Sequence, residues 1–225
     1  MGDTALANKK ARKTNSSDCF FKPKTDAQRD FYHRILSHPI SFGVGAAGTG
    51  KSHVAVSCAC EALRNGYVSK IIISRPAIEA GEKLGFLPGD MNEKLAPYVR
   101  PIYDLLEEIV GIKEVAKLTL SKSLEIAPLA FLRGRTFKNS FVLLDEAQNA
   151  TKEQLLMFLS RIGEGSFLSI TGDISQNDLG REGSGLQDAI ERLYGINEIS
   201  FTHFGKEDIV RHPLIGKIIS RYEQA

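Results

Sequence analysis

Eight residues near the start of the chain have the spacing of a phosphate-binding loop. Residues 45–52 read GAAGTGKS and match the pattern G-x-x-x-x-G-K-[ST] at each fixed position. Glycines allow successive backbone N–H groups to turn toward a phosphate, and a helix starting after the loop adds the positive end of its dipole. Lys51 would reach the β- and γ-phosphates of a nucleotide, and the Ser52 hydroxyl would bind magnesium. We expect the nucleotide to contact Gly45, Ala46, Ala47, Gly48, Thr49, Gly50, Lys51, Ser52 and His53.

An acidic pair follows an apolar run later in the chain. Residues 141–144 read FVLL, which is typical of a strand, and Asp145 and Glu146 come directly after it. We expect this strand to neighbour the strand that precedes the loop, so that Asp145 holds the magnesium shell, usually through water. Glu146 could then orient and deprotonate an attacking water molecule. A glutamate at this position favours hydrolysis over phosphoryl transfer to a small molecule.

Two further motifs place polar side chains near the ends of expected elements. Residues 172–176 read GDISQ and put Gln176 where it could sense a γ-phosphate, although a turn with an Asx cap explains the same residues. Arg211 stands just before a helix that Pro213 would open, where a surface salt bridge is the alternative. We count Gln176 and Arg211 as candidate catalytic residues beside Lys51 and Glu146.

Helical and strand-like patterns alternate along most of the chain. Thr25 and Gln28 form a capping box at the start of the first helix. Leu155, Leu156 and Leu159 give a later helix its apolar face. The expected helices are 25–37, 51–63, 151–161 and 185–193, and the expected strands are 40–44, 69–74, 141–144, 167–171 and 196–201. This alternation predicts an α/β fold with a mostly parallel sheet and helices on both faces.

Residues 76–135 break that rhythm. They hold five of the eight prolines, and Pro97 and Pro101 should interrupt a helical stretch over residues 91–110. We interpret this stretch as an insertion within a single domain of residues 19–225, lying between the second strand and the strand before Asp145. Residues 1–18 are polar and basic, which indicates a disordered tail.

Composition limits the class of protein. With 225 residues, 42% of them hydrophobic and 25% charged, the chain can build an ordinary core. No apolar run approaches the roughly 20 residues that a membrane span needs, and the start does not resemble a secretory signal. Three cysteines cannot all pair, so we expect reduced thiols and a cytoplasmic location. A net charge of +2 neither requires nor excludes a nucleic-acid partner.

At this point the sequence resembles the PhoH family of P-loop ATPases, over about residues 25–219. Besides the loop, the matching stretches are SRPAIEAGEKLGFLPG at 74–89, EIAPLAFLRGR at 125–135, DEAQ at 145–148, TGDISQ at 171–176 and DIVRHP at 208–213. The loop alone is generic, whereas the stretches together are specific. The resemblance implies one RecA-like core related to superfamily-one helicases and a role in ATP-dependent RNA metabolism. The chain resembles the short, stand-alone form of bacteria and their phages, without an appended nuclease or RNA-binding domain.

The resemblance also implies roles for individual residues. Gln28 would read adenine as the glutamine of a Q-like motif, although its place in the capping box is a sufficient reason for it. Gln176 would correspond to the helicase glutamine that senses the γ-phosphate. Arg75 lies in the segment that corresponds to the first motif facing nucleic acid, and the alternative is a structural cation at a strand end.

Helicases bind ATP between two RecA-like domains, and the second domain supplies an arginine to the site. This chain has length for one such domain. The resemblance therefore implies a neighbouring subunit that completes the site, in a head-to-tail ring, as a hexamer. Arg211 is the candidate for the arginine supplied in trans, and Arg161 is its rival.

The resulting expectation is an ATP- and Mg²⁺-dependent hydrolase that moves or remodels single-stranded nucleic acid, with RNA favoured over DNA. An ATP-gated, ring-forming assembly protein with slow hydrolysis is the main alternative. A small-molecule kinase lacks an arginine-rich lid in this sequence, and a metal-dependent nuclease would need acidic residues that the nucleotide site already uses.

Overall fold

The computed structural model describes residues 20–76, 91–176 and 184–210, with Leu214 and Arg221 beyond them. Three sequence-based expectations fall outside these residues. They are the basic tail of residues 1–18, much of the long matching stretch at 74–89, and Arg211. The described residues hold the phosphate loop and the acidic pair, so the nucleotide site can be built from them.

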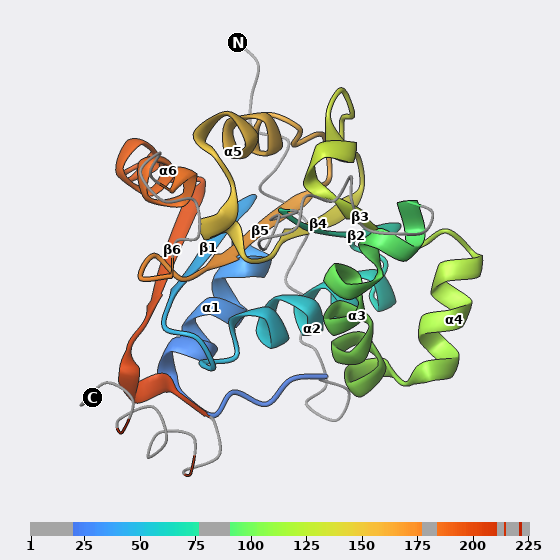
Figure 1. Ribbon diagram of the computed structural model, residues 1–225, viewed down its shortest axis with the longest axis horizontal. Coiled ribbons are helices and arrows are strands. Elements are labelled where there is room, and N and C mark those ends of the chain that lie inside the picture. The colour runs from blue at the N-terminus through green and yellow to red at the C-terminus, as the bar shows by residue number, and fades with distance from the viewer. Residues whose placement is uncertain (1–19, 77–90, 177–183, 211–213, 215–220, 222–225) are drawn as a thin grey trace.

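A six-stranded sheet, parallel throughout, lies at the centre of the molecule (Figure 1). Its strand order is β3-β2-β4-β5-β1-β6, which places β1 between β5 and β6. The strands are β1 (Ile40–Gly45), β2 (Lys70–Arg75), β3 (Leu124–Pro128), β4 (Ser140–Leu144), β5 (Phe167–Gly172) and β6 (Ile199–Phe204). Because all pairings are parallel, every strand brings its carboxyl end to the same edge of the sheet.

Helices cover both faces of this sheet, as predicted (Figure 1). One apolar cluster joins the sheet to α1 (Asp26–Ser37), α2 (Lys51–Arg64), α3 (Met91–Val110) and α4 (Ile112–Leu120). A second cluster joins the other face to α5 (Lys152–Leu159) and α6 (Gly185–Leu193). The result is a RecA-like α/β core. Over the part of the chain that the structure describes, no helix is long and apolar enough to cross a membrane.

Strands β2 and β4, neighbours inside the sheet, show why the sequence builds this arrangement. All five residues of β4 are buried, and so are the four inner residues of β2, because helices press on both faces. Continuous runs of Ile, Val, Leu and Phe suit such a position, whereas a half-exposed strand would alternate with polar residues. The runs IIIS and FVLL thus correctly predicted two strands, and both lie inside the sheet.

The expectations for residues 76–135 were partly wrong. Helix α3 runs unbroken for 20 residues through Pro97 and Pro101. Pro101 is exposed, and its missing N–H removes one backbone hydrogen bond from the helix without ending it. The same stretch returns to the sheet as the edge strand β3, which pairs with β2 from Ile71 opposite Leu124 to Arg75 opposite Pro128. It is thus an elaboration that contributes a strand of the core.

Two other elements differ from the prediction by two residues or more at one end at least, while the remaining bounds agree within one residue. Strand β6 ends at Phe204, three residues after the predicted end. Strand β6 starts at Ile199 and not at residue 196, because Ile196 lies in the turn that follows α6 and is 42% exposed. Helix α5 ends at Leu159, two residues before the predicted end. Its apolar face uses Leu155 and Phe158, while Leu156 is 70% exposed. The inclusion of Leu156 in that face was therefore wrong.

Candidate nucleotide-binding site

The phosphate loop joins the carboxyl end of β1 to the start of α2. Gly50 takes the cap position of α2 with φ of 84° and ψ of 15°, in the left-handed region that favours glycine. A Cβ atom at Gly50 would also lie 2.8 Å from Nε2 of Gln28. The loop geometry thus needs the glycine that the pattern predicts, and the first N–H groups of a 14-residue helix face its mouth.

Lys51 folds back over its own loop. Its Nζ donates hydrogen bonds to the carbonyl oxygens of Gly45 and Ala46, at 2.7 Å each. The residue is only 8% exposed. These carbonyls hold the ammonium group inside the loop, where the sequence predicts a cation for the phosphates.

Asp145 connects three elements at the carboxyl edge of the sheet. Its Oδ1 accepts hydrogen bonds from the hydroxyls of Ser52, at 2.7 Å, and Thr171, at 2.6 Å. Its Oδ2 accepts from the guanidinium of Arg75, with Nη2 at 2.6 Å and Nε at 3.0 Å. The carboxylate is 4% exposed, and these donors on both oxygens compensate its burial.

The sheet order corrects one expectation about Asp145. Its strand, β4, pairs with β2 and β5 and does not neighbour β1, because β5 lies between them. Asp145 still reaches Ser52, since all the carboxyl ends meet at one edge. Thr171, near the end of the intervening strand, donates to the same oxygen of Asp145 that accepts from Ser52. The intervening strand therefore supports the contact between Asp145 and Ser52.

Glu146 lies one residue beyond Asp145, in a different environment. Its backbone has φ of 57° and ψ of 41°, the left-handed conformation, which turns the chain from β4 into the short 3₁₀ helix η3 (Ala147–Asn149). The side chain is exposed, and its Oε2 accepts a hydrogen bond of 2.7 Å from Nε2 of Gln148. The turn therefore buries the aspartate and leaves the glutamate open to solvent.

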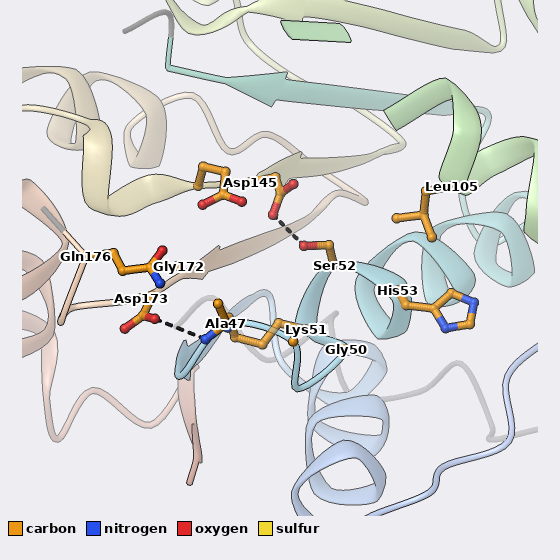
Figure 2. Close-up of a pocket in the computed structure, with 12 residues that line it drawn as sticks. Ala47, Gly50, Lys51, Ser52, His53, Leu105, Asp145, Gly172, Asp173 and Gln176 are labelled. Carbon is orange, nitrogen blue, oxygen red and sulfur yellow. Dashed lines mark hydrogen bonds between the residues drawn. The ribbon is translucent and has the colours of Figure 1, made fainter. Parts of the chain in front are cut away.

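These groups surround one cavity of about 300 Å³. Figure 2 shows the loop and α2 on one side of it and the ends of β4 and β5 on the other. The lining residues are Ala47, Gly48, Gly50, Lys51, Ser52, His53, Leu105, Asp145, Glu146, Gly172, Asp173 and Gln176. Lys51, Ser52, Asp145, Glu146 and Gln176, predicted from three separate motifs, thus share one cavity.

His53 lines this cavity at its α3 end, with Leu105 close by (Figure 2). Its ring meets the ring of Phe21 edge-on, with centroids 5.5 Å apart. Burial lowers the pKa of His53 below its ordinary value, and the charge of Glu108 opposes that change. At neutral pH this environment favours an uncharged imidazole beside the cavity.

A profile of the family described as PhoH-like protein matches residues 20–223. The chain belongs to the PhoH family. Among curated relatives, it is 48% identical over 211 residues to the PhoH-like protein of Bacillus subtilis, covering 93% of this chain and 66% of the relative. It is 45% identical to the PhoH-like protein of Synechocystis, covering 91% and 62%, and 44% identical to Protein PhoH of Escherichia coli, covering 88% and 57%. The chain thus spans roughly three fifths of the length of these relatives.

Solved structures resemble this PhoH-family chain only distantly. The helicase domain of Hef from Pyrococcus furiosus aligns with a TM-score of 0.49 and 13% identity, covering 81% of this chain and 38% of the other. The Pif1 helicase of Candida albicans aligns with a TM-score of 0.41 and 16% identity, covering 89% and 44%.

Gln28 takes a place that the capping box alone does not explain. Its N–H donates to Oγ1 of Thr25 at 3.2 Å, as a capping box requires. Its Oε1, however, accepts from the N–H of Lys24 at 2.8 Å and not from that of Thr25, so only half of the predicted capping box forms. Its Nε2 donates to the carbonyl of Thr49 at 2.8 Å. Gln28 therefore braces the phosphate loop of this PhoH-family chain, while adenine recognition stays a prediction.

The three arginines considered for the site have different positions. Arg75 binds Asp145, so one role of this residue is that of a cation at a strand end. Arg161 lies beyond the end of α5 and donates from Nε to the carbonyl of Met157 at 3.1 Å. Arg211 lies outside the described residues, but the N–H of Val210 donates to the carbonyl of Gly48 at 3.0 Å. The chain just before Arg211 therefore lies against the loop of its own subunit.

Sequence reasoning missed the two polar residues that tie these motifs together. Thr171 reaches Asp145, and Gln148 reaches Glu146. Both stand inside stretches on which the PhoH resemblance rests. Thr171 also ends a strand-like run, which predicts a side chain at the carboxyl edge of the sheet. That position was the available signal for Thr171, whereas Gln148 is placed by a turn that local patterns do not reveal.

Proposed function

We propose that this chain is a Mg²⁺-dependent ATP hydrolase that remodels or moves along single-stranded nucleic acid, with RNA favoured over DNA. The observation that best supports hydrolase activity is the hydrogen bond between Ser52 and Asp145. Lys51 and Glu146 line the same cavity. This set contains a cation for the phosphates, a metal-binding pair and a base for water.

The residues present fit a magnesium ion that arrives with the nucleotide. Mg²⁺ prefers hard oxygen ligands. The Ser52 hydroxyl and the Asp145 carboxylate supply two such oxygen atoms, and these are 2.7 Å apart. When bound, the metal neutralises charge on the β- and γ-phosphates. Ser52 and Asp145 would hold it, while Arg75 and Thr171 orient the aspartate.

In the proposed reaction, a water oxygen attacks the γ-phosphorus and the bond from that phosphorus to the ADP oxygen breaks. Glu146 accepts the proton of the water, and Lys51 stabilises the charge of the phosphates. Gln176 lines the same cavity, which supports a contact with the γ-phosphate. Glu146 is exposed and lines the cavity, which supports its access to water.

The nucleic-acid and assembly parts rest on the family. The described residues form one RecA-like sheet, whereas helicases complete the ATP site with a second such domain. We propose that a neighbouring subunit takes this place in a hexameric ring, with Arg211 as the residue supplied in trans. Cys60 is a buried cysteine outside any disulfide, which supports a reducing compartment and hence the cytoplasm.

Steady-state ATP hydrolysis, with and without single-stranded RNA or DNA, tests this proposal. We expect several-fold stimulation by RNA, and a loss on the order of 10²–10⁴ in kcat for Glu146→Gln. Lys51→Ala should abolish binding of the triphosphate. Mixing Lys51→Ala subunits with Arg211→Ala subunits should restore part of the activity if sites are shared. A protein that hydrolyses no ATP would refute the hydrolase itself.

The second candidate function is an ATP-gated assembly protein that forms a ring, hydrolyses slowly and moves nothing. The described residues hold one RecA-like sheet, and ATP bound at its edge could stabilise contacts between subunits without movement of one domain against another. A slow rate that does not respond to polynucleotide, together with ATP-dependent growth of the particle in sedimentation, would select this function over the motor.

A further inference from the structure

A chain of hydrogen bonds connects the phosphate loop to Glu146. The N–H of Ala47 donates to Oδ2 of Asp173 at 3.0 Å, as Figure 2 shows. The N–H of Asp173 donates to Oε1 of Gln148 at 3.0 Å. Nε2 of Gln148 in turn donates to Oε2 of Glu146 at 2.7 Å. The carboxamide of Gln148 therefore links the backbone of Asp173, just after β5, to the proposed base, Glu146.

Gln148 is held rigidly in this position. It is 2% exposed, so water does not compete for either end of its carboxamide. Gly172 makes room for it, because a Cβ atom there would lie 2.9 Å from Oε1 of Gln148 and 2.6 Å from Cδ2 of Leu186. Glu146, by contrast, is exposed and could adopt other rotamers. The buried amide therefore fixes a carboxylate that would otherwise be free to turn toward solvent.

We propose that Gln148 is the positioning residue of Glu146 and that Asp173 makes this positioning depend on the phosphate loop. The inference rests on the proposed hydrolysis at the same site. Gln148 touches no reacting atom in this role, because it acts through the carboxylate that it holds. A neutral amide suits the task, since it donates to Glu146 without changing the charge of the site.

The Asp173 contact explains how the loop could control the base. Ala47 belongs to the loop whose N–H groups cradle phosphates, and the Asp173 carboxylate already accepts its hydrogen bond. A triphosphate brings negative charge to this carboxylate and competes for the same N–H group. The carboxylate that binds Ala47 and the backbone N–H that binds Gln148 belong to one residue, so a shift of the Asp173 backbone would move Gln148 and reach Glu146. Occupancy of the loop is thereby linked to the placement of the base.

The test separates catalysis from binding and from folding. Gln148→Ala removes both hydrogen bonds, whereas Gln148→Glu keeps an acceptor for Asp173 and loses the donor to Glu146. Gln154→Ala is the matched control, because this glutamine binds the N–H of Thr151 in the capping box of α5 and lies outside the cavity lining. For each variant, kcat, the Kd for a fluorescent non-hydrolysable ATP analogue, and Tm are measured.

We expect Gln148→Ala and Gln148→Glu each to lower kcat on the order of 10²-fold, with Kd unchanged within about threefold. Gln154→Ala should lower Tm and leave kcat unaltered. In a Glu146→Gln background, Gln148→Ala should produce no further loss of kcat, because both changes remove one function.

Different results would overturn different statements. If the wild-type protein hydrolyses ATP and Gln148→Glu does so equally fast, Gln148 does not position the base. The same conclusion follows if the losses of Gln148→Ala and Glu146→Gln multiply. If the wild-type protein hydrolyses no ATP, the proposed function fails, and the positioning role fails with it.

Discussion

The ion pairs at the edge of the sheet provide a prediction whose size follows from the structure. Glu125 on β3 binds Arg135 through two hydrogen bonds, of 2.6 and 2.9 Å, and binds Nζ of Lys70 on β2 at 2.6 Å. Glu125→Gln keeps the shape of the side chain and removes its charge. Both cations then face a neutral amide, and the cross-link from β2 to the chain after β3 weakens.

The pKa of the Glu125 carboxyl gives the magnitude. Hydrogen bonds from Arg135, and next from Lys70, lower this pKa from 4.5 to about 2, although burial opposes them. That difference corresponds to at most about 3 kcal/mol of stability. The side chain is 28% exposed and its partners about a third exposed, so solvent screens the charges. We therefore expect Glu125→Gln to cost about 1–2 kcal/mol at neutral pH.

The pH dependence has a definite sign. The folded-state pKa lies below the unfolded value, so the stabilisation is complete above about pH 4.5 and is lost as the pH falls toward 2. Urea unfolding of the wild type and of Glu125→Gln should differ by about 1–2 kcal/mol at pH 7 and by about half as much at pH 3. The exposed Glu198→Gln serves as the control. A difference that is the same at both pH values would refute the reasoning.

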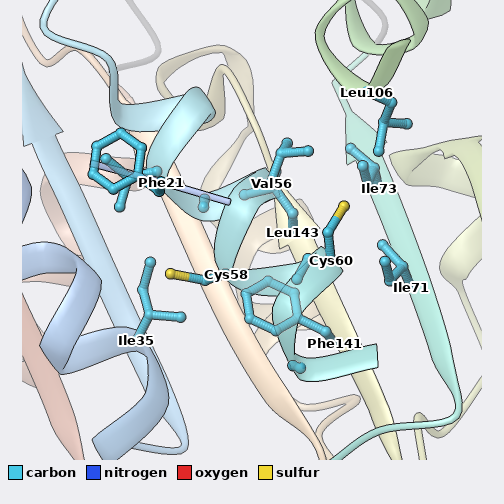
Figure 3. Packing of buried hydrophobic residues seen from close by; sticks show 14 of the residues in the cluster. Phe21, Ile35, Val56, Cys58, Cys60, Ile71, Ile73, Leu106, Phe141 and Leu143 are labelled. Atoms are coloured by element: carbon cyan, nitrogen blue, oxygen red, sulfur yellow. The ribbon is translucent and has the colours of Figure 1, made fainter. Parts of the chain in front are cut away.

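Three further predictions concern the core and the site. Leu155→Ala should lower the free energy of unfolding by about 2–5 kcal/mol and Leu156→Ala by less than about 0.5 kcal/mol, since only Leu155 is buried. Equal losses in chemical denaturation would contradict the orientation of α5. Cys60 lies among buried apolar side chains (Figure 3), and this burial raises the pKa of its thiol to about 12. A thiol reagent at pH 8 should therefore label Cys60 only after unfolding, which peptide mapping would detect. Arg75→Ala leaves the Asp145 carboxylate without its guanidinium partner and should cost about 2–3 kcal/mol, and a melting temperature equal to that of the wild type would show that the hydroxyl donors suffice.

The sequence predicted the features that depend on neighbours along the chain. The spacing GAAGTGKS needs only a strand, a turn and a helix, and the structure has these at Ile40–Gly45 and Lys51–Arg64. The run FVLL before Asp145 is apolar, and FLSIT before Gly172 is mostly so, because both strands are buried on two faces. Parallel strands then bring these ends together without any further information. For these reasons Ser52, Asp145 and Gln176 could be assigned to one site in advance.

The features that the sequence did not reveal depend on tertiary contacts. Strand β3 is short, holds the charged Glu125 and ends in Pro128, so its pattern is weak until β2 is beside it. The place of Gln148 depends on Asp173 and on the lack of a side chain at Gly172, far along the chain. No local periodicity reports such a contact, and only the fold reveals it.

The phosphate loop is supported by segments from distant parts of the chain. Strand β1 pairs with β6, the N–H of Ala46 donates to the carbonyl of Phe204, and Val210 binds Gly48. During synthesis the loop leaves the ribosome long before these partners exist, with both edges of β1 still unpaired because β5 and β6 follow later in the chain. Nucleotide affinity should therefore appear only after residue 210 has emerged. Until then, the growing chain must shield an open strand edge by other means, and ATP cannot yet stabilise it.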